Sequence, residues 1–135
     1  MKISLSKAEA IIAEAKEVVL AKGLPPMSIS VVDDGAHLVA FCRMDGAFVG
    51  AIDVAHRKAR TAALFKANSS VVGENFKSGA AAQSLENSNG GLMGFGGGVV
   101  LRDVQGEVIG AVGVSGGSTD QDELVAQAAA VAITG

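Results

Sequence analysis

Two segments of the chain carry the same succession of strand, turn, strand, loop and helix, and this repeat constrains the fold most. Residues 31–35 and residues 99–103 begin the matching units. The first unit turns at Asp33-Asp34-Gly35-Ala36, where Asp-Gly suits a tight hairpin, and the second turns at Val104-Gln105-Gly106-Glu107. Because hairpins join antiparallel strands, the repeat predicts an α+β fold with one antiparallel sheet of four to five strands flanked by helices.

A helix should precede the first unit, over about residues 6–22. Apolar residues recur there at helical spacing, and Ser6 with Glu9 has the S-x-x-E form of a capping box. Gly23 and the prolines that follow it should end this helix, since glycine tolerates the left-handed C-cap and proline cannot continue the helix.

The remaining regular elements are the strands of the two hairpins and the helix that follows each hairpin. Their expected ranges are 27–32, 37–43 and 51–67 in the first unit, and 99–103, 108–115 and 118–133 in the second. Ser118 and Gln121 again have the capping-box form. The order is therefore αββα, an irregular insert, then ββα, in a single domain over residues 1–135.

The insert between the two units is irregular and rich in glycine. Short helices are expected from Ser69 to Phe76 and from Ser78 to Leu85, and glycines follow at 90–91, 94 and 96–98. Long irregular segments inside a compact domain are more often functional than inert. This insert is therefore the first place to expect a binding site.

Composition excludes several classes of function. The net charge is −3, and tryptophan and tyrosine are absent, which argues against a nucleic-acid partner. No apolar run approaches the roughly 20 residues that cross a membrane. A single cysteine, Cys42, and the lack of a signal-peptide pattern favour a cytoplasmic location. With 49% hydrophobic residues, apolar surface should fill a core or subunit interfaces.

No complete catalytic site emerges from the motifs. Residues 113–117 match G-x-S-x-G, but a nucleophilic serine needs a base, and in the hydrolase fold that base follows the serine. Both histidines, His37 and His56, precede Ser115, and neither has the spacing of a zinc site. Asp122 and its acidic neighbours are interpreted as residues that stabilise a helix start, so no metal site is expected.

Several segments together resemble the GlcG/HbpS family of small haem-binding and related proteins, which also supplies the C-terminal domain of PduO-type corrinoid adenosyltransferases. These segments are SVVD at 30–33, GAHLVA at 35–40, RMDGA at 43–47, KARTA at 58–62, VIGAVGVSGG at 108–117 and QDE at 121–123. The resemblance implies a profilin-like sandwich, a homo-oligomer and a small-molecule site often at subunit junctions. Haem or another tetrapyrrole is the implied ligand, a corrinoid is an alternative, and a role beside glycolate, propanediol or glycerol metabolism is implied.

The candidate ligand-binding residues are cations that suit ligand carboxylates, an exposed aromatic, and glycines of the loops. They are Arg43, Lys58, Arg60, Phe95, Gly96, Gly97, Gly116 and Gly117. His56 and His37 are candidate axial ligands for haem iron, because a neutral imidazole binds iron. Two other functions stay open. One is an enzyme for a small hydroxy- or oxo-acid, with Arg43 or Lys58 holding the acid and His56 or Asp45 as base. The other is an oligomeric assembly partner of a larger enzyme.

Overall fold

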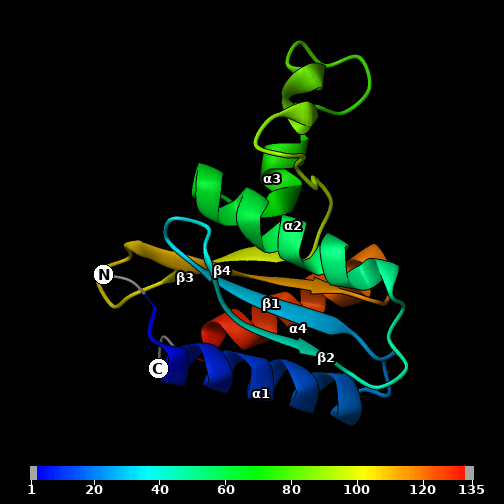
Figure 1. The fold of residues 1–135 in the computed structure, drawn as a ribbon, viewed down its shortest axis with the longest axis vertical. Coiled ribbons are helices and arrows are strands. Elements are labelled where there is room, and N and C mark those ends of the chain that lie inside the picture. The colour runs from blue at the N-terminus through cyan, green and yellow to red at the C-terminus, as the bar shows by residue number, and fades with distance from the viewer. Residues whose placement is uncertain (1–2, 133–135) are drawn as a thin grey trace.

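A four-stranded antiparallel sheet with helices on both faces forms the body of the protein in the computed structural model, which describes residues 3–132 (Figure 1). The strands run in the order β2-β1-β4-β3 across the sheet. Their bounds are β1 Ser28–Asp33, β2 Leu38–Arg43, β3 Gly98–Arg102 and β4 Val108–Ser115. The predicted α+β class and the order αββα–insert–ββα are confirmed, with four strands in the sheet.

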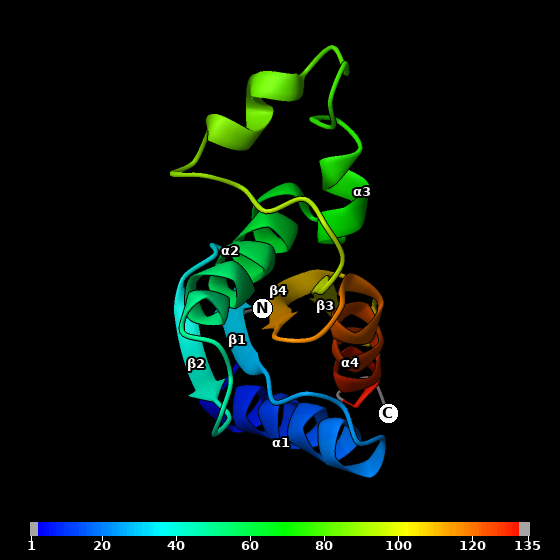
Figure 2. The ribbon, with the colours of Figure 1, turned by 90° about the vertical axis from the view of Figure 1, so that its right-hand side faces the viewer.

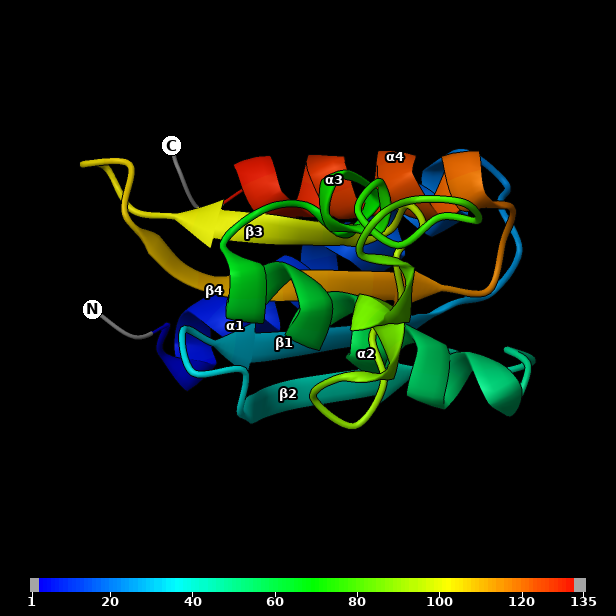
Figure 3. The ribbon, with the colours of Figure 1, turned by 90° about the horizontal axis from the view of Figure 1, so that it is seen from above.

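Three helices cover the sheet. Helices α1 (Leu5–Ala21) and α4 (Thr119–Val131) lie on one face, and α2 (Gly50–Phe65) lies over β1 and β4 on the other (Figure 3). The insert contains α3 (Ser69–Gly73) and a 3₁₀ turn, η1 (Gln83–Asn87), and it projects away from the sheet on the α2 side (Figure 2).

Alternation along the strands divides the interior into two unequal parts. Ile29 and Val31 of β1 join the larger core beneath α1 and α4. Their neighbour Val32 packs instead with Ala59 and Ala62 of α2, because successive side chains of a strand point to opposite faces. Small residues dominate this second core, and α2 therefore lies close to the sheet.

Two local predictions need correction. Helix α1 is capped by Ser4, whose Oγ accepts a hydrogen bond from the Lys7 N–H at 3.1 Å, so the predicted capping box at Ser6 is wrong. The predicted helix over 78–85 is also wrong, because regular structure there is limited to η1. The capping box of Ser118 with Gln121 is confirmed, since each side chain accepts from the other residue's N–H.

The two hairpins share one turn geometry. The N–H of Asp33 donates to the carbonyl of His37 at 2.9 Å, and the N–H of Asp103 donates to the carbonyl of Glu107 at 2.9 Å. The structure therefore aligns Asp33 of the first unit with Asp103 of the second. This alignment is shifted by two residues from the one that the sequence suggests, in which Val31 corresponds to Val99. The left-handed residue of the turn is Ala36, with φ of 66°, in the first hairpin and Gly106, with φ of 85°, in the second.

Replacing Gly106 by alanine should lower the free energy of unfolding by about 1 kcal/mol, because a Cβ is disfavoured in the left-handed region. No atom lies within 4 Å of the Cβ position, so the effect is one of backbone conformation alone. The matched change Ala36→Gly should act in the opposite direction and more weakly, since it also removes a methyl packed near Val32. Chemical denaturation followed by far-UV circular dichroism measures both, and a neutral Gly106→Ala would contradict this account.

Candidate functional site

A buried ion pair at the end of β4 connects the helices that lie on opposite faces of the sheet. The Lys58 Nζ of α2 lies 2.9 Å from Asp122 Oδ2 of α4 and donates a second bond of 2.9 Å to the carbonyl of Val114. Lys58 is 0% exposed and Asp122 is 2% exposed. The pair therefore connects α2 to α4 past the end of the sheet, inside the protein.

The glycine-rich loop before β3 closes over Lys58. The Phe95 ring centre lies 4.6 Å from Lys58 Nζ, which is cation–π distance, and the ring remains 43% exposed on its outer side. Gly97 has φ of 123°, and a Cβ there would lie 2.5 Å from the Val114 carbonyl oxygen and 2.7 Å from Lys58 Nζ. Its N–H donates to Glu123 Oε1 at 2.8 Å. Glycine is therefore required at 97 for the loop to approach the lysine.

The glycines after β4 surround the other partner of the ion pair. The N–H of Gly117 donates to Asp122 Oδ1 at 2.9 Å, and Gly116 also interacts with this carboxylate through its backbone. The structure thus brings together six of the predicted site residues around the end of β4. They are Lys58, Phe95, Gly96, Gly97, Gly116 and Gly117.

Burial shifts the pKa of both charged partners. It lowers the pKa of the Lys58 ammonium and raises the pKa of the Asp122 carboxyl, and the opposite charge of the partner counteracts only part of each effect. Because both polar contacts of Lys58 are internal and its side chain is wholly buried, the pair holds α2 to β4 and α4. Phe95 is the part of this cluster that faces outward.

His56 lies elsewhere, between α2 and the sheet. Its Nδ1 is 3.0 Å from the Oγ of Ser30, which is itself fully buried on β1. Burial lowers the pKa of His56, the positive charge of Arg60 lowers it further, and the carboxylate of Asp53 opposes them. The imidazole is therefore neutral at pH 7, and its ring orientation is held by Ser30.

The other predicted residues are spread over the surface. The His37 side chain is 77% exposed and lies 3.2 Å from Asp33 Oδ1 in the first hairpin turn. Arg43 donates to the carbonyl of Ala47 at 3.2 Å, and Arg60 donates to the carbonyl of Asn89 at 2.8 Å. Arg43 also lines a groove of about 530 Å³ with Lys16 and Cys42. None of these side chains joins the Lys58 cluster.

The sequence did not predict two residues of these contacts, Asp122 as the partner of Lys58 and Ser30 as the partner of His56. A signal for Asp122 exists, because it precedes Val125, Ala126 and Ala129 at helical spacing and so falls on the inward stripe of α4. Lys58 likewise lies between Ala55 and Ala62 on the stripe that α2 buries. Two opposite charges on buried stripes favour a buried pair, although the pairing itself is not local.

Metal and membrane features are absent from the described part of the chain. No cluster of three or more His, Cys, Asp or Glu side chains within residues 3–132 suits a metal ion. Across the same residues, every helix is too short or too polar to cross a membrane.

The antiparallel sheet, the two helical layers and the glycine loops define a small α+β domain of the profilin-like kind. The chain belongs to the HbpS-like family, whose model carries the description "haem degrading protein HbpS-like" and matches residues 3–131. The predicted resemblance is therefore confirmed.

Individual relatives agree with this assignment. The chain is 40% identical over 113 residues to the protein GlcG of Escherichia coli K12, a match that covers 84% of this chain and 81% of GlcG. The Klebsiella pneumoniae protein ORFY has a TM-score of 0.92 with 32% identity, covering 98% of this chain and 92% of ORFY. A crystal structure of a PduOC–haem complex has a TM-score of 0.90 with 31% identity, covering 98% of this chain and 96% of that one.

Proposed function

We propose that this protein binds haem or a related tetrapyrrole, with His56 as the iron ligand. The observation that carries the proposal is the neutral, half-buried imidazole held through Nδ1 by Ser30 at 3.0 Å. If Nδ1–H donates to the serine, the lone pair of Nε2 is free for a metal, as in most histidine-ligated sites. Similarity to the PduOC–haem complex and membership of the HbpS-like family support this ligand.

The surface of α2 around His56 suits an amphipathic ligand. At about 100° per residue, Val49 lies roughly 20° from His56 on the helix, and Ile52 and Arg60 lie roughly 40° to either side. Apolar side chains therefore precede the imidazole along this stripe and a cation follows it. A haem presents the same combination, an apolar ring with carboxylates at one side, so the residues fit the group.

Strand β2 adds an aromatic residue near this stripe. Phe41 of β2 is the cross-strand partner of Ser30 and therefore lies on the same face of the sheet as the serine that holds His56. It is half-buried, which leaves part of its ring available to a ligand. Haem bound at His56 would supply iron chemistry, while this chain supplies the imidazole, the apolar wall and Arg60.

Exposed apolar residues at the start of α2 support the expected homo-oligomer, which stays a prediction. Phe48 is 74% exposed and Val49 is 69% exposed, and adjacent exposed side chains of this size favour contact with another protein surface. A second copy covering them would enclose the ligand stripe of α2. Multi-angle light scattering with and without hemin tests whether the protein assembles and whether the ligand changes the assembly.

Hemin titration at pH 7 tests the proposed ligand and the proposed histidine together. The wild-type protein should show a saturable, shifted Soret band, and His56→Ala should lose it because the iron ligand is gone. Ser30→Ala should retain the band but weaken affinity roughly tenfold, since the serine only orients the imidazole. His37→Ala, an exposed histidine outside this stripe, is the matched control and should bind like wild type.

Each departure from this pattern has a definite meaning. A normal band in His56→Ala would remove His56 from the site, and its loss in His37→Ala would transfer the role to His37. Absence of a shift in the wild-type protein would overturn the haem proposal, and the same titration with cobalamin would then test the corrinoid alternative.

A further inference from the structure

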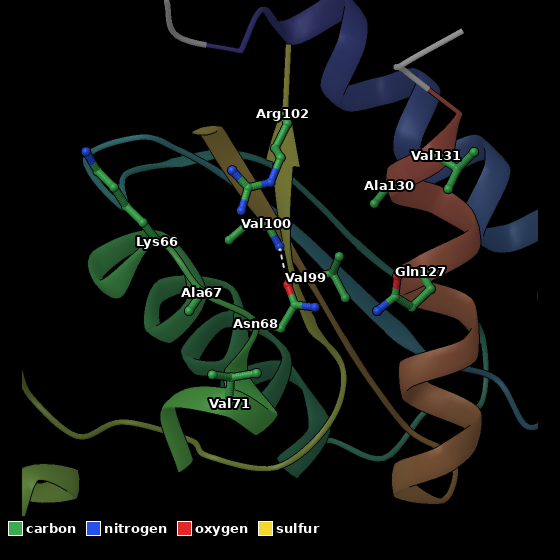
Figure 4. A pocket seen from close by; sticks show the side chains of 10 residues that line it. All are labelled: Lys66, Ala67, Asn68, Val71, Val99, Val100, Arg102, Gln127, Ala130 and Val131. Atoms are coloured by element: carbon green, nitrogen blue, oxygen red, sulfur yellow. Dashed lines mark hydrogen bonds between the residues drawn. The ribbon is translucent and has the colours of Figure 1, made fainter. Parts of the chain in front are cut away.

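A groove runs along the edge of β3 that pairs with no other strand, at the opposite side of the sheet from β2 (Figure 4). It lies between α3, β3 and α4 and has a volume of about 460 Å³. The polar residues of its lining are Lys66, Asn68, Arg102 and Gln127, and Val71 and Val99 are among the apolar ones. The stripe of α2 that carries His56 contributes no residue to it.

The outer edge of β3 is closed to another strand. The N–H of Val100 donates to Asn68 Oδ1 at 3.1 Å, and the N–H of Gly98 donates to Ser69 Oγ at 2.9 Å. Side chains therefore satisfy two donors that a free edge strand would otherwise offer to a peptide. This arrangement favours a small molecule over an added strand as the occupant of the groove.

The charged groups that line the groove among residues 3–132 are all positive. Lys66 and Arg102 line it, and no carboxylate of the described residues does. Neither cation forms an ion pair within residues 3–132, where Arg102 donates to the carbonyl of Gly106 at 2.9 Å. In Figure 4 the Arg102 guanidinium lies beside the strand near Val100, and the Lys66 side chain extends outward, away from Asn68. An anionic group is the complement of this pair.

The rest of the lining is apolar or neutral. Val71, Val99 and Val131 provide the apolar surface from three different elements. Asn68 uses its Oδ1 on β3, which leaves its amide N–H groups for a ligand oxygen, and Gln127 extends toward it from α4 (Figure 4). We infer that this groove binds a small organic carboxylate, with Arg102, Lys66 and Asn68 at its carboxyl group and the valines along its hydrocarbon chain.

The backbone conformation at Lys66 allows its charge to be removed without destabilising the fold. Lys66 is the C-cap of α2 and has φ of 53°, a left-handed conformation that favours glycine over any residue with a Cβ. Lys66→Gly should therefore remove the cation and keep or raise the stability of the fold. Weaker binding by this variant would not be explained by unfolding.

The experiment is a titration of the ¹⁵N-labelled full chain with hexanoate, followed by amide chemical shifts. Saturable shifts are expected for Asn68, Val100 and Gln127. Lys66→Gly and Arg102→Gln should each weaken hexanoate binding roughly tenfold, because each removes one charged hydrogen bond. Lys77→Gln removes an exposed cation outside the groove and should leave binding unchanged.

Comparison probes decide the chemical class. Hexan-1-ol and inorganic phosphate should each bind much more weakly than hexanoate, since one lacks the charge and the other lacks the apolar chain. Equal binding of phosphate would reduce the groove to an unspecific anion site and overturn the inference, as would an absence of saturable shifts with hexanoate. Shifts at these residues that depend on protein concentration alone would assign the groove to a second copy of the chain instead.

Discussion

Replacing Lys58 by methionine should lower the free energy of unfolding by about 3–5 kcal/mol, the usual effect of removing one member of a buried ion pair. Methionine keeps most of the apolar stem but leaves the Asp122 carboxylate buried without its partner at 2.9 Å. Because the chain contains no tryptophan, far-UV circular dichroism during guanidinium unfolding is the measurement of choice. A loss below 1 kcal/mol would show that water reaches Asp122 and that the pair is not isolated.

The double variant Lys58→Met with Asp122→Asn separates lost charge from lost packing. Asparagine keeps the Oδ1 that accepts from Gly117 at 2.9 Å, but it carries no buried charge. The double variant should therefore recover at least half of the stability that Lys58→Met loses. If it is no more stable than the single variant, the lysine contributes through packing and not through its charge.

The loss in Lys58→Met should also depend on pH in a defined direction. The pKa of Asp122 is already raised by burial, and removal of Lys58 takes away the charge that counteracts this rise. A carboxyl with a raised pKa in the folded state destabilises the protein above that pKa, and the penalty fades as pH falls toward the unfolded value of about 4. The stability difference from wild type should therefore narrow as pH falls from neutral toward about 4.

The second large effect is expected at Gly113, where alanine should lower the free energy of unfolding by about 3 kcal/mol. A Cβ at this position would lie 2.0 Å from the carbonyl oxygen of Ala55 and 2.6 Å from the backbone nitrogen of Ala59. Both atoms belong to the backbone of α2, so no side-chain rotation relieves the overlap. The helix would have to move away from the sheet and from the small-residue core beneath it.

Gly50→Ala is the matched control for Gly113→Ala. Gly50 begins α2, has no atom within 4 Å of its Cβ position and does not have a positive φ. Alanine there should leave stability unchanged or raise it slightly, because alanine favours a helix. Equal losses in the two variants would show that the close approach of α2 to the sheet is not what requires glycine at 113.

Structural features that depend on residues close together in the chain could be predicted from the sequence. The strand and helix order, the hairpins and the capping box at Ser118 follow from apolar periodicity and from residues three apart. Even so, Ser4 and not Ser6 caps α1, because two serines near one helix start satisfy the same local rule. The turn likewise places Ala36 and not Gly35 in the left-handed conformation, since strand pairing on both sides decides the register.

The candidate site was predicted only in part, for a related reason. Local patterns were enough to predict the fold class and to select Lys58, Phe95, Gly97 and His56 as residues of interest. The burial of Lys58 against Asp122, 64 positions later in the chain, and the contact of His56 with Ser30 became visible in the folded structure alone. Such contacts depend on which faces of elements distant in the sequence meet in the fold. The spacing of residues within one element does not show which other element it contacts. The groove beside β3 has the same origin, because it exists only where α3, β3 and α4 come together.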